Sequence, residues 1–253
     1  MPTQAATQAR AEKSSVEDNI IKMPERDRTQ DKGNQPDPNA LPREIPSLDR
    51  LMDDAKLPPI YRNASRKDFD DGLTRFGIPM GNNTVRYVSH HDCSLNRTGM
   101  FLNGLTGVGK THFAAAVLRE WLPLACWINR SFTPPTVASS ARWLPVNEFI
   151  LELKATMHRD SKVTAATIME RRCSANALVL DDVGAEAKTD YTLTNIYTLI
   201  DTRISQGRPT IVTSNLTLAQ LNNYDSRLAS RLLGMSYYRL VGPDRRDGEL
   251  NDE

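Results

Sequence analysis

The chain has 253 residues, with 32 Lys and Arg against 31 Asp and Glu, a net charge of +1 and a pI of about 7.7. This balance excludes a uniformly basic nucleic-acid binder, so any DNA contact has to come from a local patch or from several assembled copies. The three cysteines lie too far apart for a Cys-x-x-Cys zinc site, and no apolar run approaches the roughly 20 residues that span a membrane.

The first 45 residues are rich in Gln, Asp, Glu, Lys, Arg and Pro and contain few large apolar side chains. Such a segment cannot bury enough surface to offset the entropy of ordering it. We predict a disordered tail over 1–45, which either stays solvated or carries a short partner-binding stretch near 16–23. Because it lacks the apolar core of a signal peptide, we expect a cytoplasmic protein without a membrane partner.

From residue 46 onward the pattern is that of a globular domain, and short helices are expected at 45–55 and 66–76. Further along, apolar runs predict strands at 99–103, 142–146, 177–180, 210–213 and 237–241. Segments of helical periodicity lie between them, at 110–121, 147–158 and 190–206. This alternation predicts an α/β fold in three α/β/α layers with a five-stranded parallel sheet. The segment 126–142 does not fit the alternation and is expected to be a loop or an extra hairpin.

The sequence Gly104-Leu-Thr-Gly-Val-Gly-Lys-Thr111 matches the P-loop pattern G-x-x-x-x-G-K-[ST] between an expected strand and an expected helix. Its glycines allow backbone N–H groups to face phosphates, and the helix that follows adds the positive end of its dipole. Lys110 is predicted to contact the β- and γ-phosphates, and the Thr111 hydroxyl to bind Mg²⁺. We therefore expect ATP and Mg²⁺ as ligands of the residues Gly104, Thr106, Gly107, Val108, Gly109, Lys110, Thr111 and His112.

Polar side chains follow two other expected strands, at the edge where open α/β sheets bind ligands. Asp181 and Asp182 end the apolar run Leu178-Val-Leu180. We predict that Asp181 holds Mg²⁺ and that Asp182 orients or deprotonates the attacking water, although its side chain is shorter than the Glu of many such ATPases. Asn215 closes the next strand, where it either senses the γ-phosphate or caps the strand.

Two arginines, Arg227 and Arg231, are four residues apart and share one face of an expected helix. One hypothesis is that an arginine here reaches the γ-phosphate of a neighbouring subunit and stabilises the charge of the transition state. The alternative is that both arginines form ion pairs on the surface of their own chain.

The P-loop is followed by Leu-Asp-Asp-Val-Gly-Ala-Glu at 180–186, Thr-Ser-Asn-Leu at 213–216 and Ser-Arg-Leu at 230–232. In this order, over about residues 45–246, these motifs resemble the AAA+ ATPases of the DnaC/DnaI/IstB group. That group comprises bacterial and phage helicase loaders and transposition helper ATPases. The resemblance implies an AAA+ ATPase domain over 46–253 that lacks a full C-terminal lid.

The resemblance also implies function. It predicts ATP hydrolysis, weak in the isolated chain, as a switch in an oligomer that binds single-stranded DNA and a hexameric replicative DNA helicase. It makes Arg231 the arginine finger and Asn215 the first sensor, with Arg227 supporting self-association at the subunit interface. The gene is then expected in a phage or prophage.

Two further segments take roles from the resemblance. Tyr61 and Arg62 fall where relatives line the adenine pocket, and either Arg245 or Arg246 follows the last strand as a second sensor. A transposition helper remains an alternative function, as does a nucleotide-gated adaptor with little hydrolysis, which Asp182 in place of Glu allows. Loaders of this group carry either an N-terminal zinc-binding domain or a helical helicase-binding domain. The first 45 residues match neither, so the mode of helicase binding stays open.

Two minor signals remain. His90-His91-Asp92-Cys93 invites a metal-site interpretation, but adjacent residues rarely converge on one ion, and a loop or strand end is expected instead. Basic residues between the second and third strands either face DNA in an assembled ring or form a solvated helix face. They are Lys154, His158, Arg159, Lys162, Arg171 and Arg172.

Overall fold

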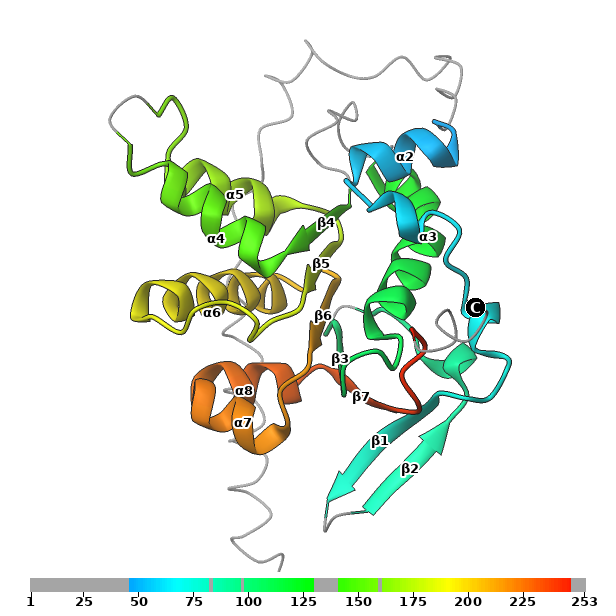
Figure 1. Ribbon diagram of the computed structural model, residues 1–253. Helices are drawn as coiled ribbons and strands as arrows, with labels where there is room; N and C mark the ends of the chain where they lie inside the picture. The colour runs from blue at the N-terminus through cyan, green and yellow to red at the C-terminus, as the bar shows by residue number, and fades with distance from the viewer. Residues whose placement is uncertain (1–45, 82–83, 97, 130–140, 159–160, 247–253) are drawn as a thin grey trace, which may run out of the picture. The chain divides into compact units, whose positions relative to one another are not determined.

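The computed structural model describes residues 46–81, 84–96, 98–129, 141–158 and 161–246. The predicted tail over 1–45 lies outside these residues. The described residues form one seven-stranded sheet in the order β2-β1-β7-β3-β6-β5-β4, with helices on both faces (Figure 1).

Five neighbouring strands of this sheet run parallel. They are β3 (Met100–Gly104), β4 (Arg142–Pro145), β5 (Leu178–Asp181), β6 (Thr210–Ser214) and β7 (Ser236–Val241). Every residue of β3, β5 and β6 is buried, as expected of parallel strands that are covered on both faces. The predicted α/β fold and its five parallel strands are thereby confirmed.

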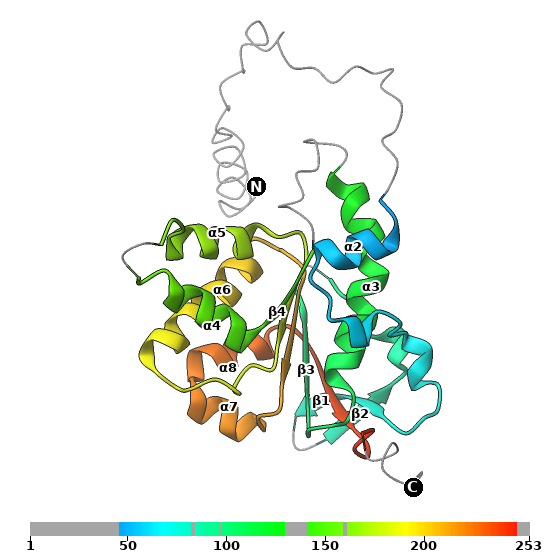
Figure 2. The same cartoon turned by 45° about the horizontal axis from the view of Figure 1, so that its top comes forward.

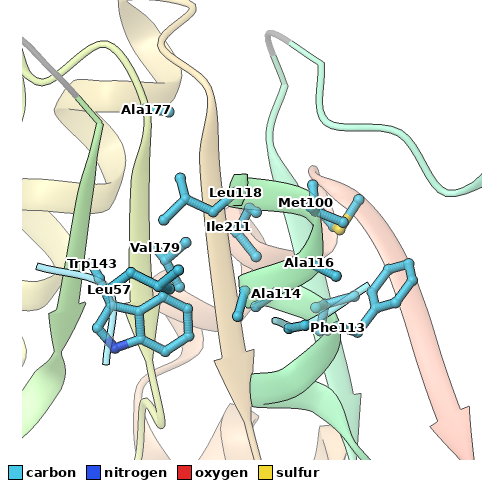
Figure 3. Packing of buried hydrophobic residues seen from close by; sticks show 14 of the residues in the cluster. Leu57, Met100, Phe113, Ala114, Ala116, Leu118, Trp143, Ala177, Val179 and Ile211 are labelled. Carbon is cyan, nitrogen blue, oxygen red and sulfur yellow. The ribbon is translucent and has the colours of Figure 1, made fainter. Parts of the chain in front are cut away.

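Two helical layers cover the sheet, and Figure 2 shows them on opposite sides of it. One layer contains α2 (Leu48–Asp54) and α3 (Lys110–Asn129); Figure 3 shows Ala114 and Leu118 of α3 against Ile211 and Val179 of the sheet. The other layer contains α4 (Val146–Ala155), α5 (Ala165–Ser174), α6 (Asp190–Ser205), α7 (Leu218–Tyr224) and α8 (Ser226–Leu233). Each layer has its own apolar cluster, so the sheet separates two cores.

The sheet is extended by a hairpin that the sequence did not predict. Strands β1 (Arg75–Gly81) and β2 (Thr84–Val88) pair antiparallel, and β1 also pairs antiparallel with β7. The helix expected over 66–76 is therefore wrong beyond its first turn: η3 (Arg66–Phe69) is a single 3-10 turn. Gly72 then adopts a left-handed φ of 69°, which turns the chain into β1.

Helix boundaries differ from expectation in two places. Helix α3 continues to Asn129, so the start of the segment expected to be a loop or hairpin is helical, and 130–140 lies outside the described residues. Helix α5 was not predicted, although Thr164 caps it by accepting a hydrogen bond from the Thr167 amide at 3.1 Å. Among the residues described, no helix is long and apolar enough to cross a membrane.

Arg203 is a fully buried cation that ties α6 to the start of β6 and the end of α5. Its Nε donates to Thr210 Oγ1 at 2.9 Å, and its Nη atoms donate to backbone carbonyls, among them Ala175 O at 2.8 Å and Pro209 O at 2.7 Å. Burial lowers the pKa of Arg203 to about 9. The guanidinium thus donates to carbonyls at the end of α5 and in the segment before β6, where Pro209 O also accepts from the Leu178 amide at 3.1 Å.

We expect Arg203→Ala to lower the free energy of unfolding by about 3 to 5 kcal/mol, because it removes several hydrogen bonds and the packing of a fully buried side chain. Chemical denaturation measures this change. Arg171→Ala, on exposed helix surface, serves as the control and should change stability by no more than about 0.5 kcal/mol. Equal losses in the two variants would contradict a special role for the buried guanidinium.

Candidate functional site

The P-loop connects β3 to α3 at the carboxyl edge of the parallel strands. A Cβ at Gly104 would lie 2.4 Å from the carbonyl oxygen of Leu240, so β3 can end beside β7 only with glycine there. Gly109 takes a φ of 96°, in the left-handed region, immediately before the helix begins at Lys110. Within this loop Thr106 is exposed, and Val108 is buried and accepts a hydrogen bond from Thr74 Oγ1 at 3.1 Å.

The ammonium group of Lys110 lies inside the loop, and the residue is only 6% exposed. Its Nζ donates to the carbonyl oxygen of Leu105 at 2.7 Å and to Asn215 Oδ1 at 2.5 Å. Burial lowers the pKa of Lys110 to about 8, against the opposing effect of Asp182 and Asp181. Lys110 therefore links the P-loop to Asn215, which directly follows β6.

The two predicted magnesium ligands are in direct contact. Asp181 Oδ1 accepts a hydrogen bond from Thr111 Oγ1 at 3.2 Å and another from Thr213 Oγ1 at 2.7 Å. Burial raises the pKa of the Asp181 carboxyl, whereas these two hydroxyl donors lower it. A carboxylate and a hydroxyl oxygen beside each other are ligands that Mg²⁺ accepts, with water completing its shell. The residues present fit Mg²⁺.

Asn215 connects Lys110 to Asp182. Its Nδ2 donates to Asp182 Oδ1 at 2.6 Å, while its Oδ1 accepts from the lysine. Asp182 has a positive φ of 64°, which is uncommon for a residue other than glycine, and its amide donates to Thr213 Oγ1 at 2.8 Å. Thr213 therefore orders both acids, a role that the sequence analysis missed because it assigned only Asn215 within that motif.

Of the residues expected near the adenine, Tyr61 contacts His112 beside the P-loop, whereas Arg62 contacts a different part of the chain. Tyr61, at the end of η2 (Pro59–Tyr61), packs edge-on against His112 with ring centroids 6.0 Å apart. Burial raises the pKa of Tyr61, with a further contribution from the charge of Asp181. Tyr61 and His112 thus border the P-loop together. Arg62 instead forms an ion pair with Asp53 of α2.

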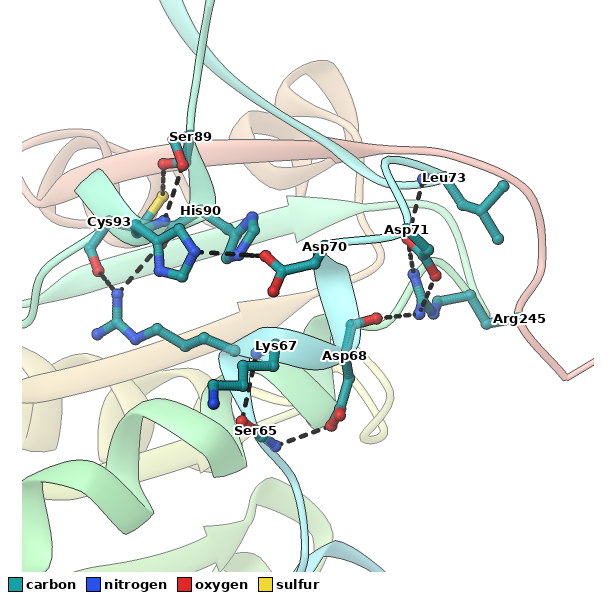
Figure 4. A network of polar contacts seen from close by, with 12 residues as sticks. Ser65, Lys67, Asp68, Asp70, Asp71, Leu73, Ser89, His90, Cys93 and Arg245 are labelled. Atoms are coloured by element: carbon teal, nitrogen blue, oxygen red, sulfur yellow. Dashed lines mark hydrogen bonds and ion pairs between the residues drawn. The ribbon is translucent and has the colours of Figure 1, made fainter.

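The segment after β7 contacts the P-loop. It contains Arg245 and Arg246, which the sequence could not tell apart as candidates for the second sensor. The Arg245 amide donates to the Gly107 carbonyl at 3.0 Å, and its guanidinium bonds to Asp71 Oδ2 at 2.7 Å and to the Asp68 carbonyl at 2.6 Å (Figure 4). Arg246 is exposed, and its charge contributes to lowering the pKa of Lys110. Arg245 is consequently held by protein groups, whereas Arg246 lies within electrostatic reach of the phosphate-binding lysine.

Arg227 and Arg231 lie on α8, in the helical layer opposite α3. Arg231 Nε pairs with Asp201 Oδ1 of α6 at 2.6 Å, and Arg227 pairs with Asp225 at 3.0 Å while covering the Tyr197 ring. Within a single chain both arginines are engaged in surface ion pairs and are not brought to the P-loop. Their proposed action in a neighbouring subunit stays a prediction.

A family model described as IstB-like ATP binding protein matches residues 39–236 of the chain. The replicative helicase loader DnaI of Bacillus subtilis (strain 168) is 29% identical over 161 residues, covering 60% of this chain and 46% of DnaI. The chromosomal replication initiator protein DnaA of Zymomonas mobilis is 29% identical over 133 residues, covering 53% of this chain and 25% of DnaA. The chain therefore spans less than half the length of these curated relatives. A crystal structure of the DnaC helicase loader is 20% identical with a TM-score of 0.47, covering 72% of this chain and 99% of that one.

The lowered pKa of Lys110 predicts a pH dependence of nucleotide binding. Below about pH 8 the lysine is charged and attracts the phosphates; above it, affinity should fall by up to tenfold per pH unit until the pKa of the complex is reached. Anisotropy of a fluorescent ATP analogue between about pH 7 and about pH 9.5 measures this fall.

The fall in nucleotide affinity at high pH can be distinguished from unfolding of the protein. Because the pKa of Lys110 is lower in the folded than in the unfolded chain, this group adds stability as the pH rises above about 8. Lys110→Met should bind weakly and show no such slope. A slope equal to that of the unmodified protein would assign it to another group.

Proposed function

The chain belongs to the IstB-like ATP-binding protein family, and from this premise we propose that it is an ATPase that helps to load a replicative DNA helicase onto single-stranded DNA. The observation that carries the ATPase proposal is the hydrogen-bonded network of Lys110, Asn215, Asp182, Thr213, Asp181 and Thr111 at one edge of the sheet. Similarity to the helicase loader DnaI supports the second half of the proposal.

In this proposal each side chain of the network has one task. Magnesium-bound ATP supplies the phosphoanhydride bond that water breaks. Lys110 neutralises phosphate oxygens, Thr111 and Asp181 hold the metal ion, and Asp182 orients the water or accepts its proton. Asn215 reports the state of the site, because its bond to Lys110 competes with the phosphates for the same ammonium protons.

The charge that develops on the γ-phosphate in the transition state is stabilised by a further cation, and within the described residues of one chain Arg231 is not brought to the P-loop. Arg231 of a neighbouring copy supplies this cation in this proposal, which requires exchange of its pair with Asp201 for the γ-phosphate. Arg227 supports the same interface. Arg246, rather than the fully engaged Arg245, is the second sensor, since its charge already acts on Lys110.

Mixing two inactive variants tests the action of Arg231 in a neighbouring subunit. We expect Lys110→Ala and Arg231→Ala each to lose ATP hydrolysis by about 10³-fold. Mixtures should recover part of it, because some interfaces then combine an intact Lys110 with an intact Arg231. Phosphate release measures both. No recovery, in mixtures shown by light scattering to co-assemble, would place Arg231 outside the neighbouring site.

Asp182→Asn tests whether hydrolysis matters at all. The switch hypothesis expects Asp182→Asn to bind ATP normally, to hydrolyse it at least about 100-fold more slowly and to fail in helicase loading. A nucleotide-gated adaptor instead keeps its loading function in Asp182→Asn and loses it only in Lys110→Ala. Full loading activity in Asp182→Asn would therefore replace the switch by the adaptor.

Single-stranded DNA is proposed to follow the basic residues of α4, α5 and the segment between them. Among these, Lys154, His158, Lys162 and Arg171 are exposed. Arg172 is mostly buried and pairs with Glu152, so it serves the fold instead, and Arg159 lies outside the described residues. The exposed cations make the stronger candidates for phosphate contact.

The partner is identified by affinity capture of the full-length tagged protein, with ATP and Mg²⁺, from the organism that encodes it. We expect recovery of a hexameric replicative helicase, and reconstitution from the two purified proteins as confirmation. Deletion of 1–45 should abolish the contact if the tail carries it, with retained ATP binding showing that the domain is folded. Recovery and reconstitution of a transposase in place of the helicase would support the transposition helper instead.

A further inference from the structure

Asp70, His90 and His91 bring three metal-binding atoms together outside the nucleotide site. Asp70 follows η3, and the two histidines begin the turn η4 (His90–Asp92). Their ligand atoms all lie within 4.8 Å of one another, and Figure 4 shows Asp70 beside His90. The expectation that His90 and His91 lie at a loop or strand end is confirmed, since η4 follows β2, and the structure adds Asp70 from a separate turn.

The distances match those between ligands of one tetrahedral ion. Zinc binds imidazole nitrogen and carboxylate oxygen at about 2.0 to 2.1 Å, so two of its tetrahedral ligands lie about 3.3 Å apart. Asp70 Oδ1 is 3.0 Å from His90 Nε2 and 3.3 Å from His91 Nε2. Both contacts therefore correspond to edges of a single coordination tetrahedron.

The contact between His90 and Asp70 does not have the geometry of a hydrogen bond. His90 Nε2 is buried and has no hydrogen-bond partner among the described residues, although the carboxylate oxygen lies at 3.0 Å. His112 Nε2, by comparison, does hydrogen-bond to Asp68 Oδ2 at 2.6 Å. A buried ring nitrogen that lies this close to a carboxylate oxygen without a hydrogen bond to it is available as a ligand for a metal ion.

The surrounding residues hold this arrangement in place. The rings of Phe69 and Phe76 lie 6.3 and 6.0 Å from the His90 ring and exclude solvent from one side of it. Arg66 Nη1 donates to the His90 carbonyl at 3.1 Å, and Ser89 Oγ accepts from the His91 amide at 3.2 Å. Arg66 also pairs with Glu120 at 2.7 Å, and this carboxylate offsets the positive charge of Arg66. Ligands preorganised in this way bind an ion without ordering the chain first.

We propose that Asp70, His90 and His91 bind one divalent transition-metal ion, with zinc the best match to two imidazoles and one carboxylate and with water as the fourth ligand. This site is separate from the predicted Mg²⁺ site. The ion joins η4 to the end of η3, where the Phe69 ring lies 3.0 Å from the Cβ position of Gly109 and beneath the Arg245 guanidinium. Metal binding therefore stabilises η3, whose Phe69 packs against the P-loop.

The test uses full-length protein freed of metal by a chelator and then titrated with Zn²⁺ in a calorimeter and with Co²⁺ in a spectrophotometer. We expect one ion per chain, the visible absorption of tetrahedral Co²⁺, and a thermal midpoint that rises with Zn²⁺ concentration. Mg²⁺ should not compete, because it prefers oxygen ligands.

Asp70→Asn and His91→Gln should each weaken Zn²⁺ binding at least about tenfold. Because the side chain of His91 is exposed, we expect His91→Gln to fold as the unmodified protein does. His158→Gln, which changes the histidine outside the site and the P-loop, is the matched control and should bind as the unmodified protein does. Absence of one-to-one binding at about 100 μM Zn²⁺, or equal binding by all variants, would overturn the proposal. Neither outcome depends on ATP hydrolysis or on a helicase.

Discussion

The buried ammonium group of Lys110 is the interaction on which the site depends. A lysine that is 6% exposed, with one backbone carbonyl and one amide oxygen as neighbours, is costly to keep charged, as its lowered pKa reflects. Asp182 and Asp181 oppose this effect of burial, and in the proposed function phosphate groups add further negative charge beside the ammonium group. The Asn215 amide accepts a hydrogen bond from Lys110 and donates one to Asp182. A shift of the lysine side chain would therefore alter the position of Asn215 and its contact with Asp182.

The P-loop is supported from two directions by residues outside its own motif. Thr213 orders Asp181 and Asp182 from β6, and the segment after β7 bonds to Gly107 through the Arg245 amide. Arg245 in turn covers Phe69, which packs against His90. The proposed metal site and the P-loop are therefore linked through one aromatic ring, so an ion at His90 and His91 acts on the rigidity of the nucleotide pocket and not on its chemistry.

Arg231 has one partner within the chain and a second, proposed partner in a neighbouring copy. Its ion pair with Asp201 is complete within the chain, and the same side chain is the candidate for the neighbouring γ-phosphate. An exposed ion pair contributes little stability, so its exchange for a phosphate contact costs little. The family assignment makes such an interface reasonable, and the mixing of variants decides it.

The sequence by itself determined the parallel α/β core, the P-loop and the acidic end of β5, because each of these is encoded within one continuous segment with its own periodicity or spacing. It did not reveal the β1–β2 hairpin, since β1 becomes a strand by pairing with β7, far away in the chain. The tertiary structure alone decided that Thr213 contacts Asp181, that Arg245 is held while Arg246 is exposed, and that Asp70 meets His90 and His91. Each of these contacts joins residues from different elements, and their distances depend on how those elements pack and not on any local pattern.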